Sequence, residues 1–277
     1  AQEYRVGLVP EAVRELVNHG HDVVVETNCG AAINFVDADY RQAGAQIADT
    51  PAEIFASADM IIKVKEPQPD ECRMLRPGQI LFTFLHLAAD MQQARGLMDS
   101  GAVAIAFETV VGDDGRSLPL LAPMSEIAGR LATQAGAHYL QTHLGGTGRL
   151  MGGVPGTHPA RVMIIGGGVS GFNAARVAAG MGAHVTILER DPGRMRALDD
   201  YFRGRAEIIY SNADNIERLS RTSDCIIGAV LIPGASAPKL VTRDMLTIMQ
   251  PGTTLVDVAI DQGGCFETAQ ATTHDDP

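Results

Sequence analysis

The sequence has no long apolar run and only four cysteines among its 277 residues. A membrane-spanning helix needs about 20 consecutive apolar residues, so we expect no membrane span. The cysteines, Cys29, Cys72, Cys225 and Cys265, form no C-x-x-C pair and show no metal-ligand spacing. We therefore expect no metal site, and a reduced, cytoplasmic protein.

Positive charge is also scarce. Lysine and arginine together number 22 against 33 aspartates and glutamates, which gives a formal net charge of −11 at pH 7. A surface of this sign repels the phosphates of nucleic acids and of anionic membranes. We therefore expect neither as a partner.

The composition is otherwise that of a globular protein, with 45% hydrophobic and 20% charged residues. The length suggests two domains, which we place at 1–124 and 125–277. Apolar segments typical of strands alternate with helical segments, which predicts an α/β fold of two Rossmann-like domains, each with a largely parallel sheet flanked by helices. The expected strands are 22–26, 60–64, 80–84, a buried strand at 102–107, 162–165, 185–188, 207–210, 225–230 and 254–258. The expected helices include 10–20, 37–43 and 125–141, the last capped by Ser125, and 145–159 is expected to be a glycine-rich loop.

The stretch 161–189 carries the strongest single motif. Four apolar residues precede Gly166, Gly168 and Gly171 in G-x-G-x-x-G spacing, and a helical segment and a second apolar strand follow. In such a unit the first glycine allows a tight turn, the second lets the backbone approach a pyrophosphate, and the third lets the helix pack on the strand. The helix N-terminus then presents free N–H groups to the phosphates. The motif predicts a dinucleotide site, and a purely structural glycine turn is the alternative.

Glu189 ends the second strand of this unit, where a carboxylate can accept hydrogen bonds from ribose hydroxyls. A carboxylate at this position repels the 2′-phosphate of NADP, so NAD is the predicted cofactor. Arg190 follows directly, and a guanidinium there would offset the repulsion. NADP therefore stays open as an alternative.

Basic residues follow two of the strands expected in the first domain. Ligands of parallel sheets bind at the carboxyl ends of strands. Lys65 is placed there to hold a carboxylate or polarise a carbonyl, and Lys63, on the same strand face, is a competing candidate. His86 can transfer protons near neutral pH. The alternatives are a lysine whose stem lies on apolar surface and a core histidine without a chemical role.

Two aspartates mark the end of the last expected strand. Asp261 precedes Gly263 and Gly264, so its carboxylate can face a nicotinamide and hold an attacking water or an ammonium ion. Asp257 lies inside the strand 254–258, and we expect it to have a structural role.

Over essentially its full length the sequence resembles the alanine dehydrogenase family. The resemblance is carried by EYRVGLVPEAVRELVNHGHDVVVE, KVKEPQP, GQILFTFLHLAAD, LPLLAPMSEIAGR, GGVPG, the glycine motif, GAVLIPGASAPKLVT and VDVAIDQGGCFE. The NAD-binding subunit of proton-translocating transhydrogenases is similar in plan, but it typically lacks an aspartate at the position of Asp261. Asp261 and the HLAAD stretch together favour alanine dehydrogenase.

The resemblance implies an L-alanine:NAD oxidoreductase that yields pyruvate, ammonia and NADH. It implies that Arg5 grips the substrate carboxylate, that Lys65 contacts the same carboxylate and the carbonyl, and that His86 and Asp261 form the acid/base pair. Read without the family, Arg5 is an ordinary surface charge. The cofactor positions that the resemblance assigns are Ser125, Val169, Ser170, Glu189, Arg194, Ser211, Val230, Leu231, Val258, Ala259 and Ile260.

The resemblance also implies a homohexamer and exposes some departures. Glu189 stands where the family usually has aspartate, which lengthens the ribose contact, and Gln270 stands where a member can carry a cofactor-contacting arginine. Judged by the family, a first strand before Ala1 and a C-terminal return into the substrate domain are missing. We therefore expect NAD binding with little alanine turnover, and a nucleotide-binding module without turnover stays an alternative.

Overall fold

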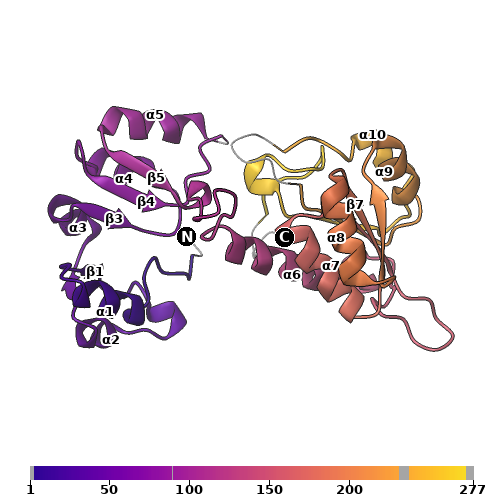
Figure 1. Cartoon of the computed structure of the whole chain (residues 1–277), viewed down its shortest axis with the longest axis horizontal. Coiled ribbons are helices and arrows are strands. Elements are labelled where there is room, and N and C mark those ends of the chain that lie inside the picture. The colour runs from indigo at the N-terminus through magenta and orange to yellow at the C-terminus, as the bar shows by residue number, and fades with distance from the viewer. Residues whose placement is uncertain (1–2, 89, 231–236, 273–277) are drawn as a thin grey trace. The chain divides into compact units, whose positions relative to one another are not determined.

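The computed structural model describes residues 3–88, 90–230 and 237–272 (Figure 1). The chain divides into two compact units, Ala1–Leu120 and Leu121–Pro277. The division falls a few residues before the expected boundary after residue 124. The reason is that the long helix that follows Leu120 packs against a helix and two strands of the second unit.

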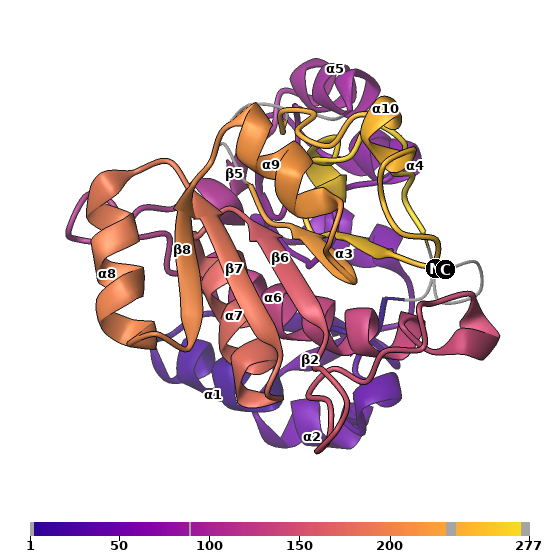
Figure 2. The same ribbon diagram turned by 90° about the vertical axis from the view of Figure 1, so that its right-hand side faces the viewer.

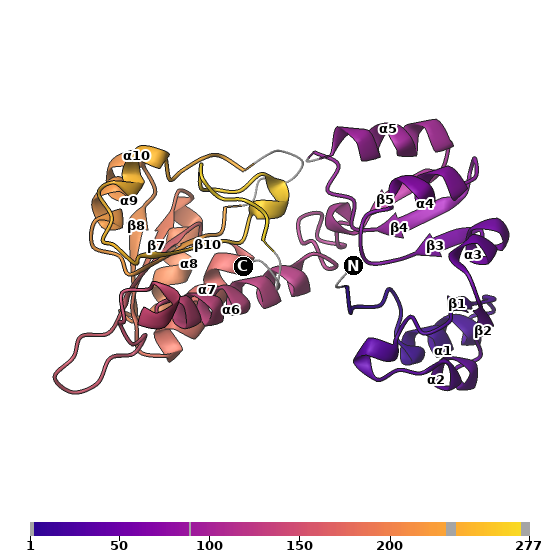
Figure 3. The ribbon, with the colours of Figure 1, turned by 180° about the vertical axis from the view of Figure 1, so that it is seen from behind.

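The first unit contains two small parallel sheets. β1 (Val24–Glu26) pairs with β2 (Gln46–Ala48), and β3 (Met60–Ile62), β4 (Ile80–Thr83) and β5 (Val103–Ala106) pair in that order. The helices of this unit are α1 (Pro10–Asn18), α2 (Asp37–Gln42), α3 (Pro51–Ser57), α4 (Pro69–Met74) and α5 (Met91–Ser100), most of them labelled beside their strands in Figure 3. Because β3, β4 and β5 are parallel neighbours, the residues that follow them lie at one edge of their sheet.

The expectation that 102–107 forms a buried strand is wrong in one respect. The strand exists as β5, but Val103 is 50% exposed and Ile105 is 39% exposed. Within the described part of the chain, β5 is the edge strand of its sheet and pairs with β4 alone. An apolar run predicts a strand, but it does not tell whether the strand lies at the centre or at the edge of a sheet.

The second unit contains one parallel sheet of order β10-β9-β6-β7-β8. Its strands are β6 (Arg161–Ile165), β7 (His184–Glu189), β8 (Ala206–Tyr210), β9 (Cys225–Gly228) and β10 (Thr254–Asp257), and Figure 2 shows β6, β7 and β8 side by side. The helices are α6 (Ala122–Tyr139), α7 (Val169–Gly180), α8 (Pro192–Phe202), α9 (Ala213–Ser220) and α10 (Arg243–Leu246). The chain passes from the edge strand β8 back to β9, beside the central β6. The strand order thus reverses at β6, which is where doubly wound sheets bind ligands.

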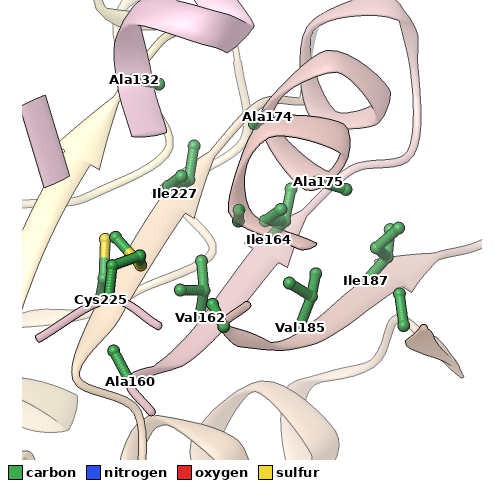
Figure 4. Close-up of a cluster of buried hydrophobic side chains, with 14 of the residues drawn as sticks. Ala132, Ala160, Val162, Ile164, Ala174, Ala175, Val185, Ile187, Cys225 and Ile227 are labelled. Carbon is green, nitrogen blue, oxygen red and sulfur yellow. The ribbon is translucent and has the colours of Figure 1, made fainter. Parts of the chain in front are cut away.

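The core of the second unit explains why these segments form strands and helices (Figure 4). Ile164, Ile187 and Ile227 come from three neighbouring strands and are fully buried. They pack against the alanine-rich face of α7, which contributes Ala174 and Ala175. Each buried isoleucine side chain contributes about 1.5–3 kcal/mol relative to an exposed one. The small alanines let the helix lie close to the sheet and so fix the position of the glycine motif at its N-terminus.

The long helix α6 begins earlier than the sequence indicates. Ser125 was expected to cap it, but the helix begins at Ala122, and the Ser125 N–H donates to the Leu121 carbonyl at 3.0 Å inside the first turn. The cap prediction is therefore wrong, because Pro123 already provides the fixed φ of a helix start. A Cβ at Gly129 would lie 2.0 Å from the Ser170 carbonyl oxygen, so α6 packs directly on α7.

Candidate functional site

The glycine-rich turn has the geometry that a dinucleotide requires. Gly166 has φ +102°, and a Cβ there would lie 2.8 Å from the Ala229 carbonyl oxygen. A Cβ at Gly171 would lie 1.8 Å from the Gly166 carbonyl oxygen, so only glycine lets α7 approach β6. At Gly168, by contrast, a Cβ would meet nothing within 4 Å. The space beside Gly168 and the N-terminus of α7 therefore fit the pyrophosphate of a dinucleotide.

The carboxylate of Glu189 accepts hydrogen bonds from backbone N–H groups of two segments, the glycine-rich turn and the residues that follow β7. Its Oε2 accepts the Gly167 N–H at 2.9 Å, and its Oε1 accepts the N–H groups of Arg190 at 2.6 Å and Asp191 at 3.0 Å. Arg194 holds the same turn from its carbonyl side, because its Nε donates to the Gly167 carbonyl at 2.6 Å. The Arg194 guanidinium also lies 5.3 Å from the centre of the Phe172 ring. The sequence did not reveal that Glu189 holds the turn.

The other predicted cofactor residues lie at the same edge of the sheet or on the helices beside it. Val169 and Ser170 open α7, and Ser125 lies in the first turn of α6. The carboxyl ends of β8, β9 and β10 carry the rest, namely Ser211, Val230, Val258, Ala259 and Ile260. Leu231 lies outside the described residues. This placement agrees with a cofactor bound at the carboxyl ends of the parallel strands.

Asp257 and Asp261 have different environments. Asp257 accepts hydrogen bonds from the N–H groups of Ala259 and Phe266, both at 3.1 Å, which confirms its structural role. Gly264 has φ +77°, and a Cβ there would lie 2.6 Å from the Asp257 Oδ2. Asp261 lies in the short 3-10 helix Ile260–Gln262 between these contacts, and it is exposed. Asp257 therefore shapes the turn from which Asp261 projects.

In the first unit, three polar side chains follow three neighbouring strands. Lys65 follows β3, His86 follows β4 and Glu108 follows β5. The Thr83 hydroxyl donates to the Lys65 carbonyl at 2.9 Å, and the Phe84 N–H donates to Val64 at 3.3 Å. These bonds hold the segments after β3 and β4 together beyond the last paired residues. The sequence placed Lys65 and His86 here but gave no role to Glu108.

His86 has an unusual backbone and a tightly held main chain. Its φ is +46°, a conformation that residues other than glycine adopt rarely. The Glu108 carboxylate accepts the His86 N–H at 2.7 Å and the Leu85 N–H at 3.1 Å. The imidazole stacks on Phe84 with 5.9 Å between ring centres. An outlier of this kind at a residue selected for its chemistry is typical of a functional site.

Of the two candidate lysines, Lys63 forms an ion pair within the first unit. The Lys63 Nζ lies 2.5 Å from both carboxylate oxygens of Glu71, and Glu71 also accepts the Gln68 N–H at 2.7 Å. Lys63 is therefore committed to the start of α4. Lys65 is exposed at the strand end. This geometry favours Lys65 as the lysine that meets a substrate.

Arg5 pairs with a neighbouring carboxylate. Its Nε and Nη2 lie 2.8 Å and 2.7 Å from the two carboxylate oxygens of Glu3, a forked pairing. The hydrogen bonds from Arg5 hold the pKa of Glu3 below its usual value, and the charge of Lys65 adds a smaller effect in the same direction. The positive charges of Arg5 and Lys65 thus both favour the ionised form of this carboxylate.

Among residues 3–88, 90–230 and 237–272, no group of three or more histidine, cysteine, aspartate or glutamate side chains could hold a metal ion. Over the same ranges, no helix is long and apolar enough to cross a membrane.

The sheet order and the glycine turn define the second unit as the nucleotide-binding part of a dinucleotide-dependent oxidoreductase. The sequence profiles of the alanine dehydrogenase/PNT family match on both sides of the division, the N-terminal domain over residues 1–128 and the C-terminal domain over residues 132–277. The chain belongs to the alanine dehydrogenase/PNT family, which confirms the resemblance seen in the sequence.

Individual relatives agree with this assignment. The chain is 56% identical to the alanine dehydrogenase of Halomonas elongata over 275 residues, which cover 99% of this chain and 74% of that protein. It is 52% identical to the alanine dehydrogenase of Mycobacterium tuberculosis strain H37Rv, again over 99% of this chain and 74% of that protein. A solved L-alanine dehydrogenase superimposes with a TM-score of 0.90 at 48% identity, covering 100% of this chain and 76% of that one. A solved transhydrogenase from Sinorhizobium meliloti superimposes with a TM-score of 0.80 at 27% identity, covering 98% of this chain and 79% of that one. These superpositions confirm the predicted fold class.

Proposed function

We propose that the chain catalyses the reversible oxidative deamination of L-alanine to pyruvate and ammonia with NAD as the oxidant. The observation that carries the proposal is that Lys65, exposed after β3, and His86, with its constrained backbone after β4, follow neighbouring parallel strands. Arg5, before α1, adds a guanidinium that already pairs with a carboxylate in a forked geometry. The relatives that share half of the sequence or more are alanine dehydrogenases. Bound NAD supplies the chemistry of hydride acceptance from the substrate Cα.

The substrate carboxylate is the group that the first unit recognises. Arg5 pairs with both oxygens of a carboxylate in the structure, and that carboxylate also feels the charge of Lys65. In the complex, the alanine carboxylate takes the place of the Glu3 carboxylate on Arg5. Lys65 then contacts the same group and the carbonyl oxygen of the keto acid. A forked guanidinium fixes the orientation of the carboxylate as well as its charge.

Two further residues handle protons and water. His86 removes the proton from the amine as the imine forms, and it serves again when water adds to the imine. Asp261, exposed on its short helix, holds the attacking water or the departing ammonium ion. Asp257 contributes indirectly, because it fixes the turn on which Asp261 stands.

NAD rather than NADP is the cofactor that Glu189 favours. Its carboxylate is held at the end of β7 by backbone N–H groups. A carboxylate oxygen can accept more than one hydrogen bond, so Glu189 can still receive a ribose hydroxyl. A 2′-phosphate at the same place would meet a negative charge. Arg190 is exposed beside it, and it is the residue that would favour NADP.

A transhydrogenase subunit is the second candidate, supported by the solved transhydrogenase that superimposes over most of this chain. It is disfavoured because Asp261 and His86 occur together here, and transfer between two nicotinamides requires neither. A nucleotide-binding module without turnover is the third candidate. The three candidate functions predict different outcomes when the chain is mixed with NAD and alanine.

Absorbance of the nicotinamide separates these candidates. Chain mixed with NAD and L-alanine should form NADH and pyruvate at a low rate, since little turnover is expected from the sequence, and pyruvate with ammonium should reverse the reaction. Reduction of an NADP analogue by NADH without any alanine would support the transhydrogenase. Binding of NAD without reduction, measured with enzyme in excess so that slow turnover is registered, would support the binding module.

The family resemblance further supports a cytoplasmic homohexamer. The four cysteines, all within the described residues, are free thiols, as in reduced compartments. Light scattering of the purified chain tests the assembly, with six copies as the expected result. A monodisperse monomer would contradict it.

A further inference from the structure

The strained backbone of His86 raises the question of what holds it. A non-glycine residue with φ +46° persists only where its surroundings fix the conformation. Three contacts do so. Glu108 accepts the N–H groups of His86 and Leu85. On the other side of the same peptide, the buried Gln93 donates from its Nε2 to the Leu85 carbonyl at 2.9 Å.

The imidazole lies beside the same carboxylate. The His86 Nδ1 is buried, has no hydrogen-bond partner among the residues that the structure describes, and lies 3.9 Å from the Glu108 Oε1. Phe84 covers one ring face in a nearly parallel stack of 4°, and Phe107 packs edge-on against Phe84. Since Nδ1 faces the interior, the nitrogen left to meet a substrate is Nε2.

We propose that Glu108 is the positioning residue of His86. Its carboxylate holds the Leu85–His86 peptide in the left-handed turn, and it favours the tautomer with the proton on Nδ1. Nε2 is then unprotonated and ready to take a proton from the substrate amine. This inference rests on the proposed role of His86 in proton transfer. Glu108 itself touches the main chain and not the reacting atoms.

The test compares two glutamates that each stand at or directly after the end of a parallel strand in the first unit. Glu108→Gln keeps the shape of the side chain and removes its charge and one acceptor oxygen. Glu26→Gln is the matched control, because Glu26 ends β1 and is exposed. Alanine oxidation by the 277-residue chain is followed with enzyme in excess. We expect Glu108→Gln to slow turnover by roughly tenfold to a hundredfold, the usual cost of removing an orienting partner. NAD affinity should not change, and Glu26→Gln should turn over at the starting rate.

A double-mutant cycle separates positioning from an independent effect. Because Glu108 acts through His86, adding Glu108→Gln to His86→Ala should leave the residual rate unchanged. A second fall of the same size would overturn the proposal. If His86→Ala alone keeps the starting rate, the proposed function of His86 fails. If His86→Ala turns over slowly while Glu108→Gln keeps the starting rate, the proposed positioning role of Glu108 is overturned and the role of His86 stands.

The tautomer can be read without turnover. In long-range proton–nitrogen spectra of the histidine-labelled chain, the His86 signal is the one that His86→Ala lacks. We expect the proton on Nδ1 in the starting chain and a mixture of tautomers in Glu108→Gln. The same single tautomer in both chains would contradict the proposal. Glu108→Asp withdraws the carboxylate by one methylene and gives the same comparison should Glu108→Gln not fold.

Discussion

The backbone N–H of Gly167 donates to the Glu189 carboxylate at 2.9 Å, so the side chain proposed to meet the cofactor ribose also shapes the glycine-rich turn. Arg194 holds the other side of Gly167 through its carbonyl. The turn is therefore organised before a cofactor arrives. Loss of Glu189 should affect the affinity for the dinucleotide and the choice between NAD and NADP together.

We predict that the chain binds NAD more tightly than NADP and that Glu189→Ala narrows the difference. A like-charge contact between Glu189 and a 2′-phosphate costs on the order of several kcal/mol. The variant should also bind NAD more weakly, because the Gly167 N–H loses its acceptor. Titration calorimetry with both dinucleotides measures this, and Glu207→Ala, an exposed glutamate on β8, is the control. Equal affinities in the unsubstituted chain would show that Arg190 dominates.

Asp224 should be important for the stability of the second unit. Its side chain is only 3% exposed, lies 3.0 Å from the Arg149 Nε and accepts the Arg161 N–H at 2.8 Å. Asp224→Ala leaves that partly buried N–H without its acceptor and should lower the free energy of unfolding by about 1–3 kcal/mol. Glu217→Ala breaks the exposed pair with Arg221 and should cost less than about 1 kcal/mol. Urea unfolding measures both, and equal costs would contradict the prediction.

The buried thiol of Cys225 should make stability fall at alkaline pH. Burial raises its pKa from 9.0 to about 12, with the charge of Asp224 adding to the effect. Between these values the unfolded chain has lost the thiol proton and the folded chain keeps it, so stability decreases as the pH rises. Relative to Cys225→Ala, the unsubstituted chain should lose up to about 1.4 kcal/mol more per pH unit in this range.

The control for this prediction is Cys29→Ala, since Cys29 is the exposed cysteine of the four. Its removal should change the slope of stability against pH much less. Urea unfolding at several pH values between about 8 and 11 gives the slope of the unfolding free energy against pH for each variant. Identical slopes in Cys225→Ala and the unsubstituted chain would show that the Cys225 thiol ionises at the same pH in both states.

Hydrogen exchange should distinguish the edge strand β5 from the central strand β6. Val103 and Ile105 are partly exposed, whereas Ile164 is fully buried between two neighbouring strands. Local opening needs much less free energy than global unfolding, so the β5 amides should exchange roughly a hundredfold faster or more. Mass spectrometry of the exchanged peptides measures this. Equal protection in the two strands would mean that another surface covers β5.

The parallel sheets and the glycine motif could be predicted because their signals are local. An apolar run of four residues before Gly166 and a helical pattern after it suffice to place β6 and α7. The position of Lys65 and His86 after strands was predicted in the same way, since each follows such a run. The residues that the resemblance assigned to the cofactor lie at the strand ends or helix starts where a cofactor would bind, apart from Leu231, which is outside the described residues.

The remaining features depend on contacts between distant residues. Glu108 meets His86 across 22 positions of sequence, and Glu189 meets Gly167 across 22 as well, so no local pattern contains either pair. The start of α6 was misplaced because Ser125 is a good capping residue, whereas Pro123 determined the first turn. A capping side chain in the sequence indicates a helix start only if the backbone there is not already helical.

The most direct test of the account measures alanine-dependent NADH formation by the chain, by His86→Ala and by Asp261→Ala. Each variant should be slower by roughly a hundredfold or more, the scale of a general acid or base, with NAD affinity unchanged. His184→Ala, an exposed histidine at the opposite end of β7 from Glu189, should keep the starting rate. The account is contradicted if the chain forms NADH from alanine and both His86→Ala and Asp261→Ala do so at the same rate.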